Sequence, residues 1–198
     1  MVLIADILFD GLPVLDLLEI TPSTSVVALI TQRDQSSISR IYRQVSRRLG
    51  LEFRKHTDGR YRANSNQGLL EGLRRSSQWL RLQATPAEPR WLACGHAGQV
   101  SAVLQPTLVQ HGNNSQQVER LLLERVLDLA VLTRPETAAT KAAAELAEVP
   151  LLRHPGGVDL IIVRAELHDQ PALQALIGAL HQQVQHHLSQ HPEQEWLG

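Results

Sequence analysis

The chain has 198 residues, of which 43% are hydrophobic and 20% charged, values typical of a globular protein and far from a disordered one. It contains no apolar run of the roughly 18 residues that a membrane-spanning helix needs, and Asp6 interrupts the N-terminus too early for a secretory signal. The single cysteine, Cys94, cannot form an internal disulfide and fits a reducing cytoplasm. We therefore expect a cytoplasmic protein of one medium or two small domains, without membrane contact.

The charge is distributed unevenly along the chain. Residues 33–83 carry twelve Arg or Lys against four Asp or Glu, whereas residues 84–198 carry seven against twelve. The net charges are therefore +8 and −5, and Lys55 is the only lysine in the basic part. Because arginine forks onto guanine edges and phosphates, this pattern predicts that one end of the molecule binds a polyanion.

The first half of the chain predicts three short helices, over residues 12–20, 26–32 and 35–49. Asp34 is well placed as the N-cap of the third helix, and Gly50 supplies the C-terminal stop that such a helix needs. This is the order of elements in a helix-turn-helix protein.

The hydrophobic pattern changes from helical to alternating after the third helix. Residues 52–57 and 60–63 flank Asp58-Gly59, a strong hairpin signal, because both turn positions require a positive φ. The polar residues 64–66 can then cap a long helix over 67–82, which ends before two prolines. These features predict a DNA-binding domain over residues 1–64, a linker and dimerisation helix over 65–83, and a hinge over 84–89.

Beyond the hinge, short apolar runs alternate with helical stretches, which is typical of an α/β domain, here residues 90–198. The strands are expected over 91–94, 127–133, 149–152 and 158–163, and the helices over 99–110, 115–126 and 171–188. Residues 136–148 are either a further helix or a long connection. Because helical sequence joins the first two strands, we expect them to lie parallel in one sheet.

The third helix carries two different faces. Four residues share an apolar face at helical spacing: Ile38, Tyr42, Val45 and Leu49. Serines and arginines occupy another face: Ser36, Ser39, Arg40, Arg43 and Arg47. Small hydroxyl residues followed by arginines suit a helix that enters a major groove. The alternative is a basic helix face that simply contacts solvent.

The hairpin that follows is also basic. Arg54, Lys55 and His56 on its first strand face Arg60 and Arg62 on its second. A basic hairpin directly after a helix-turn-helix is typical of a wing that contacts phosphates beside the groove. Alternatively, its charges protect an edge hairpin from aggregation.

The residues of this region resemble a known family. Gln35-Ser36-Ser37-Ile38-Ser39-Arg40, followed by Val45 and Leu49-Gly50, resembles the LysR-type recognition helix, which reads Gln-Pro-Ala-Val-Ser-Arg and ends at Leu-Gly. Phe53-Arg54 with Thr57 is similar to the first strand of the family's wing, and Asn66-Gln67-Gly68 to the start of its linker helix. The resemblance covers roughly residues 12–82, and Ser36 stands where the family usually has proline.

The resemblance implies a dimeric winged helix-turn-helix regulator that binds double-stranded DNA. The candidate DNA-binding residues are Gln35, Ser36, Ser37, Ser39, Arg40, Arg43, Arg47, Arg54, Arg60 and Arg62. The candidate dimerisation residues, on one stripe of the long helix, are Leu69, Leu73 and Leu80.

The second half resembles the family's periplasmic-binding-protein-like effector domain only in pieces, at residues 90–95, 127–131 and 149–151. A complete domain of this kind is nearly twice as long, so we expect a single lobe. In open parallel sheets, ligands bind beyond the carboxyl ends of the strands. A small-molecule effector would therefore lie near Gly95, His96, Gln99 and Thr133, or this rim is an ordinary loop surface.

Other chemistry is weakly supported. His187 and His191 are four residues apart, with His181 and His186 nearby, but neither a cysteine nor a carboxylate completes a metal site locally. We expect no metal, no cofactor and no enzymatic activity. The predicted function is a sequence-specific, dimeric transcription regulator. The alternative is a winged-helix module that binds proteins, joined to a ligand-binding or scaffolding domain.

Overall fold

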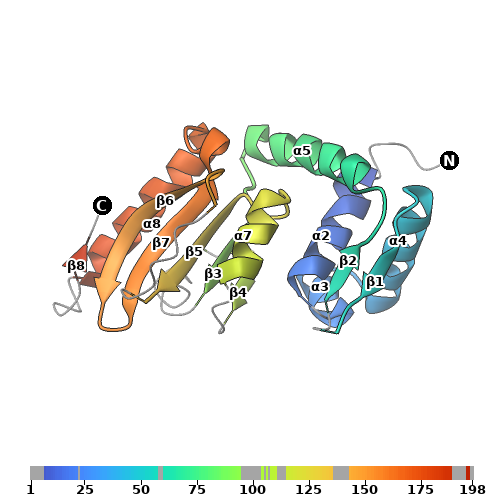
Figure 1. The fold of residues 1–198 in the computed structure, drawn as a ribbon, viewed down its shortest axis with the longest axis horizontal. Helices are drawn as coiled ribbons and strands as arrows, with labels where there is room; N and C mark the ends of the chain where they lie inside the picture. The colour runs from blue at the N-terminus through green and yellow to red at the C-terminus, as the bar shows by residue number, and fades with distance from the viewer. Residues whose placement is uncertain are drawn as a thin grey trace. The chain divides into compact units, whose positions relative to one another are not determined.

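The structure, a computed structural model, describes residues 7–21, 23–57, 60–94, 104, 106, 108–110, 115–135, 143–188 and 195–196. The chain divides into two compact units, Met1–Leu80 and Arg81–Gly198 (Figure 1). Within the described residues, no helix combines the length and the hydropathy that a membrane span requires.

The first unit is a winged helix-turn-helix. Its elements are a short π-helix, Ile7–Gly11, the helices α2 (Leu12–Ile20), α3 (Thr24–Ile30) and α4 (Gln35–Arg48), the strands β1 (Phe53–Lys55) and β2 (Tyr61–Ala63), and the start of α5 (Gln67–Gln83). The three expected helices are confirmed to within two residues at each end. The expected hairpin is also confirmed, although its strands are shorter, and the Asp58-Gly59 turn lies outside the described residues.

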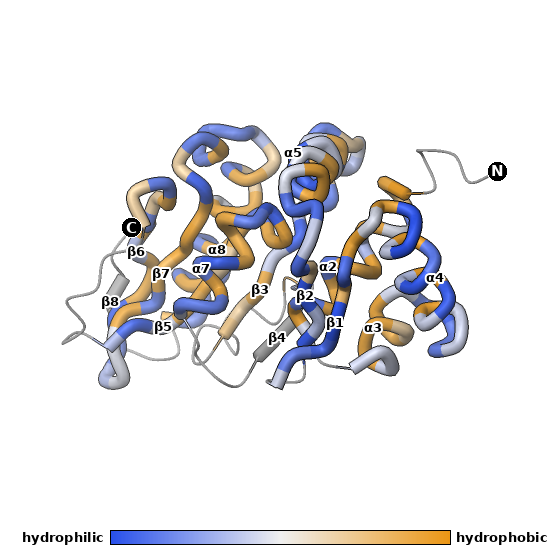
Figure 2. Tube along the Cα trace, turned by 45° about the vertical axis from the view of Figure 1, so that its right-hand side comes forward, coloured by the Kyte–Doolittle hydropathy of each residue, from blue (hydrophilic) through white to orange (hydrophobic). Residues whose placement is uncertain are grey.

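Helix α2 forms the centre of this unit. Leu12, Leu15, Leu18 and Ile20 are completely buried, and Ile38 of α4 joins them. In Figure 2, hydrophobic residues dominate α2 and hydrophilic residues dominate α4. The two helices therefore differ in role, since α2 is enclosed by the domain whereas α4 presents most of its surface to solvent.

The connection between α4 and α5 is held by side chains. Gly50 ends α4 with a φ of 62°, which glycine adopts without strain. The Asn66 amide donates hydrogen bonds to the carbonyl oxygens of Leu49, at 2.9 Å, and of Gly50, at 3.2 Å. The Ser65 hydroxyl donates to Gly50 and accepts from the Glu52 N–H at 2.7 Å. Residues expected to cap α5 thus also close the end of α4.

The described strands of the second unit form one six-stranded sheet. They are β3 (Trp91–Cys94), β4 (Leu108–Gln110), β5 (Leu129–Arg134), β6 (Leu146–His154), β7 (Gly157–Arg164) and β8 (Glu195–Trp196), in the order β4-β3-β5-β7-β6-β8. Strands β4, β3 and β5 are parallel, whereas β7 runs antiparallel to both β5 and β6. The predicted parallel pairing of β3 and β5 is confirmed.

Helices pack against this sheet. Leu173, Ile177, Leu180 and Val184 of α8 (Pro171–Leu188) share a core cluster with Trp91 and Ala93 of β3, Leu129 and Val131 of β5, and Ile161 and Val163 of β7. The alternate strand residues, such as Leu92, Ala130 and Ile162, are also buried, as are Val118, Leu121 and Leu122 of α7 (Ser115–Leu123). Because successive strand residues point to opposite faces, both faces of the sheet are covered.

Some predicted bounds in this unit were wrong. Residues 108–110, expected as the end of a helix over 99–110, form β4, and Pro106 just before them cannot sit in a helix interior. Residues 99–103, 105 and 107 of that expected helix lie outside the described residues. Helix α7 ends at Leu123, and Arg125, with a φ of 60°, turns the chain toward β5. Residues 136–142 lie outside the described part, whereas β6 already begins at Leu146.

Candidate nucleic-acid interface

The N-terminus of α4 is organised by Asp34. Its carboxylate accepts hydrogen bonds from the Ser37 N–H at 2.8 Å, the Ser37 hydroxyl at 2.7 Å, and the Ser36 hydroxyl. The Ser36 hydroxyl, followed by the two Ser37 donors, holds the pKa of Asp34 well below its usual range. The predicted N-cap is therefore confirmed, and it is an anion placed at the end of the helix where negative charge is stabilised.

The inner face of α4 fixes the orientation of the helix. Ile38, Val45 and Leu49 are buried, as predicted, and Tyr42 is half-buried. The Tyr42 ring lies 5.5 Å from the Tyr61 ring of β2, which stacks on Phe53 of β1 at 5.8 Å. These aromatic contacts, here called the aromatic column, connect the candidate recognition helix to the wing.

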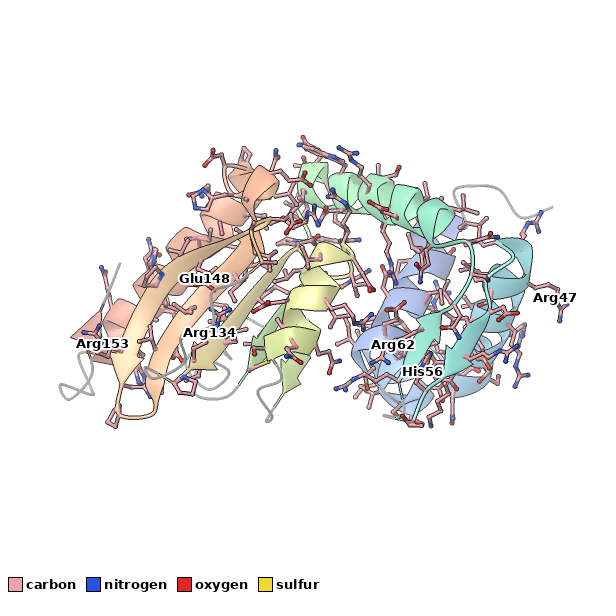
Figure 3. All side chains as sticks on the ribbon, in the orientation of Figure 1. Arg47, His56, Arg62, Arg134, Glu148 and Arg153 are labelled. Atoms are coloured by element: carbon pink, nitrogen blue, oxygen red, sulfur yellow. The ribbon has the colours of Figure 1, made fainter. Side chains whose placement is uncertain are left out.

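The outer face of α4 is basic and exposed. An open hollow of about 730 Å³ is lined by Ser36, Ser39, Arg40, Arg43, Gln44 and Arg47. The three arginines are exposed, and no described carboxylate forms an ion pair with them. The Arg47 side chain extends away from the domain in Figure 3. The Arg43 guanidinium lies 5.8 Å from the centre of the Tyr42 ring, and its pKa is raised by a hydrogen bond with Tyr42.

The wing places further cations beside this helix. Arg54 of β1 lies opposite Arg62 of β2 in the strand register, as expected from the sequence. Arg54 is exposed and lies 3.7 Å from Glu52, whereas Arg62, labelled with His56 in Figure 3, is half-buried. The Nε of Arg60 donates a hydrogen bond to the carbonyl oxygen of Ile20 at 3.2 Å, so Arg60 also fastens the wing to the end of α2.

The structure thus brings most of the predicted residues of α4 onto one face. Ser37 is not among them, because its hydroxyl donates to Asp34. The Gln35 amide donates to the Thr24 hydroxyl at 2.9 Å, which ties it to α3. Gln44 was not predicted from the sequence, although it lies on the same face of the hollow. Its spacing of four residues from Arg40 and eight from Ser36 would have identified it.

The candidate dimerisation stripe is also exposed. Leu69 is 49% exposed and Leu80 44%, with Trp79 beside them at 39%, and Leu73 is half-buried. The other side of α5 is buried at Leu70, Arg74, Ser77 and Gln78. The helix therefore has one face that packs in the domain and one apolar face that contacts solvent.

The candidate effector rim is described only at Thr133. The Thr133 hydroxyl donates a hydrogen bond to Asp159 at 2.6 Å, and the same carboxylate oxygen lies 3.2 Å from Nε2 of His154. Gly95, His96 and Gln99 lie outside the described residues. Among the described residues, no group of three or more His, Cys, Asp or Glu is placed to hold a metal ion.

Comparison with known proteins gives matches to solved structures. A full-length OxyR variant from Pseudomonas aeruginosa matches with 16% identity and a TM-score of 0.43, over 75% of this chain and 59% of that one. LysG from Corynebacterium glutamicum, a LysR-type regulator solved with arginine as effector, matches with 16% identity and a TM-score of 0.31, over 74% and 59%. DarR from Vibrio fischeri, of the same family and bound to DNA, matches with 16% identity and a TM-score of 0.28, over 72% and 57%.

The chain covers 51% to 60% of the length of these three structures and of five further matching ones. No protein-family model matches the sequence, and no curated protein matches it.

Proposed function

We propose that this chain is a sequence-specific DNA-binding transcription regulator that inserts α4 into the major groove. The observation that carries this proposal is the outer face of α4, where Arg40, Arg43 and Arg47 are exposed without a described carboxylate partner. A protein does not gain stability from three unpaired cations on one helix face, whereas a helix that binds DNA needs them.

The wing supports the same proposal. The aromatic column of Tyr42, Tyr61 and Phe53 sets the hairpin beside α4, so that Arg54 and Arg62 can contact phosphates next to the groove. Phosphate contacts would fix the register of the helix, and the residues of α4 would read the bases.

We propose further that the chain acts as a dimer through α5. The exposed stripe of Leu69, Leu73 and Leu80 is apolar, and a second copy of the same helix would remove it from water. Two-fold pairing would present two α4 helices to a nearly palindromic operator. Sedimentation of the full chain at micromolar concentration tests this part of the proposal, because a monomer would contradict it.

Selection of bound duplexes from a random pool tests DNA recognition. At physiological salt, the parent chain should enrich a defined, nearly palindromic sequence. The Arg40→Ala variant should bind that sequence about 5- to 150-fold more weakly if Arg40 contacts a base, and Arg43→Ala should also weaken binding. A chain that enriches no sequence, or variants that bind the selected site like the parent, would favour the protein-binding alternative.

A further inference from the structure

Among the residues that line the hollow on the outer face of α4, Gln44 is the one with a neutral amide side chain. It is exposed, and it shares the hollow with Arg40, Arg43 and Arg47. No hydrogen bond of its side chain occurs within the described residues. A neutral side chain at this position adds nothing to the long-range charge attraction of DNA, but its amide can form hydrogen bonds with base edges.

Gln44 lies on the same face of α4 as the candidate base-reading arginines. It follows Arg40 by four residues and precedes Arg47 by three, so the three side chains stand above one another on one face of the helix. Arg40 and Gln44 are separated by about 6 Å along the helix axis, so both side chains can reach the same stretch of a groove in which α4 lies.

The chemistry of the side chain selects the base. A glutamine amide offers one acceptor and one donor side by side, which matches N6 and N7 of adenine in the major groove. An arginine matches O6 and N7 of guanine instead. The guanidinium of the neighbouring residue Arg43 lies over the Tyr42 ring, whereas Gln44 is exposed.

We propose that Gln44 is a specificity-determining residue that reads an adenine in the operator, close to the bases contacted by Arg40 or Arg47. This inference rests on the proposed function, since it requires α4 to lie in the major groove. It goes beyond the family resemblance, which does not include this position.

The test is selection from a random duplex pool by the full-length parent and three variants. Gln44→Ala should lose the preference for adenine at one position of each half-site, by about 5- to 150-fold, and retain the other preferences. Gln44→Arg should replace adenine by guanine at that same position. Gln182→Ala, at an exposed glutamine of α8, is the matched control and should select the parent sequence.

A second readout separates base reading from phosphate binding. Gln44→Ala should bind a duplex that lacks the selected site as tightly as the parent does, because a lost phosphate contact would weaken binding to every sequence. If the parent enriches no sequence, the proposed function fails and this inference falls with it. If the parent enriches a sequence and both Gln44 variants select it unchanged, or Gln44→Ala weakens binding to specific and nonspecific duplexes equally, the inference about Gln44 alone is wrong.

Discussion

Replacement of Arg74 should destabilise the N-terminal unit more than any other single change to a charged residue there. Its guanidinium lies in α5 and is 4% exposed, and it bonds two carboxylates of α2. Nε donates to Asp16 at 2.8 Å and Nη2 to Glu19 at 2.6 Å. Burial lowers the pKa of Arg74, but the two carboxylates outweigh it and raise the pKa above its ordinary value. The guanidinium is therefore charged at every accessible pH.

The expected cost follows from what the substitution would leave behind. In Arg74→Met, Asp16 and Glu19 would remain buried, at 0% and 1% exposure, without their common cation. Removing one partner of a buried ion pair costs about 3–5 kcal/mol, a large part of the 5–15 kcal/mol or so by which a domain is stable. Asp16→Asn should cost less, about 1.5–3 kcal/mol, because the amide oxygen still accepts a hydrogen bond.

Urea unfolding followed by circular dichroism measures these free energies. The control is the triple variant Arg74→Met, Asp16→Leu, Glu19→Met, which should be close to the parent in stability, because apolar residues can replace a buried ionic group. A loss below about 1 kcal/mol in Arg74→Met would refute the reasoning. So would a triple variant as unstable as the single one.

Four further predictions follow from the structure. Leu73→Asp combined with Leu80→Asp should give a folded monomer in sedimentation, because Leu80 is exposed and Leu73 half-buried, and a dimer that persists would place the interface elsewhere. Cys94, which is buried and whose pKa is raised to about 11 by burial, should resist alkylation at pH 8 in the folded chain and react in urea, as mass spectrometry can show. Gly157→Ala should lower the melting temperature strongly, because the new Cβ would lie 2.1 Å from the Arg134 carbonyl oxygen at a φ of 135°, whereas Gly178→Ala in α8 meets no atom and should not. Arg60→Lys should lower the melting temperature but keep the salt dependence of DNA binding, which Arg60→Ala should flatten.

The sequence predicted most of the helices and the hairpin, because interactions between residues close together in the chain determine where such elements begin and end. The N-cap at Asp34, the stop at Gly50 and the apolar face of α4 each depend on residues within one or two helical turns. By contrast, β4 depends on pairing with β3, and a short run such as 108–110 carries little signal of its own. Pro106 was the one local indication against a helix there.

The charge pattern was less informative at single positions. Arg74 counted toward the basic region, yet it is buried with Asp16 and Glu19. Arg81 likewise bonds Asp128, at 2.8 Å. Two acids three residues apart in the otherwise apolar α2 could have indicated a buried partner for Arg74, but sequence alone does not say which arginine. Only the positions of α4 could be placed on an outer face, because its apolar stripe fixes the opposite side.

Arg60 shows why charge and position must be tested separately. Its Nε is 3.2 Å from the Ile20 carbonyl oxygen, so the side chain both closes the end of α2 and carries a positive charge in the wing. Lysine retains the charge but lacks the planar guanidinium group. In arginine, one N–H of that group can donate to a carbonyl oxygen while other N–H groups donate to a phosphate. If Arg60 acts on DNA through its charge, Arg60→Lys keeps the salt dependence of the parent. The lower melting temperature of this variant then reflects only the lost hydrogen bond to Ile20. If Arg60→Lys flattens the salt dependence as much as Arg60→Ala, the tether to α2, and not the charge, is what places the wing on the phosphates.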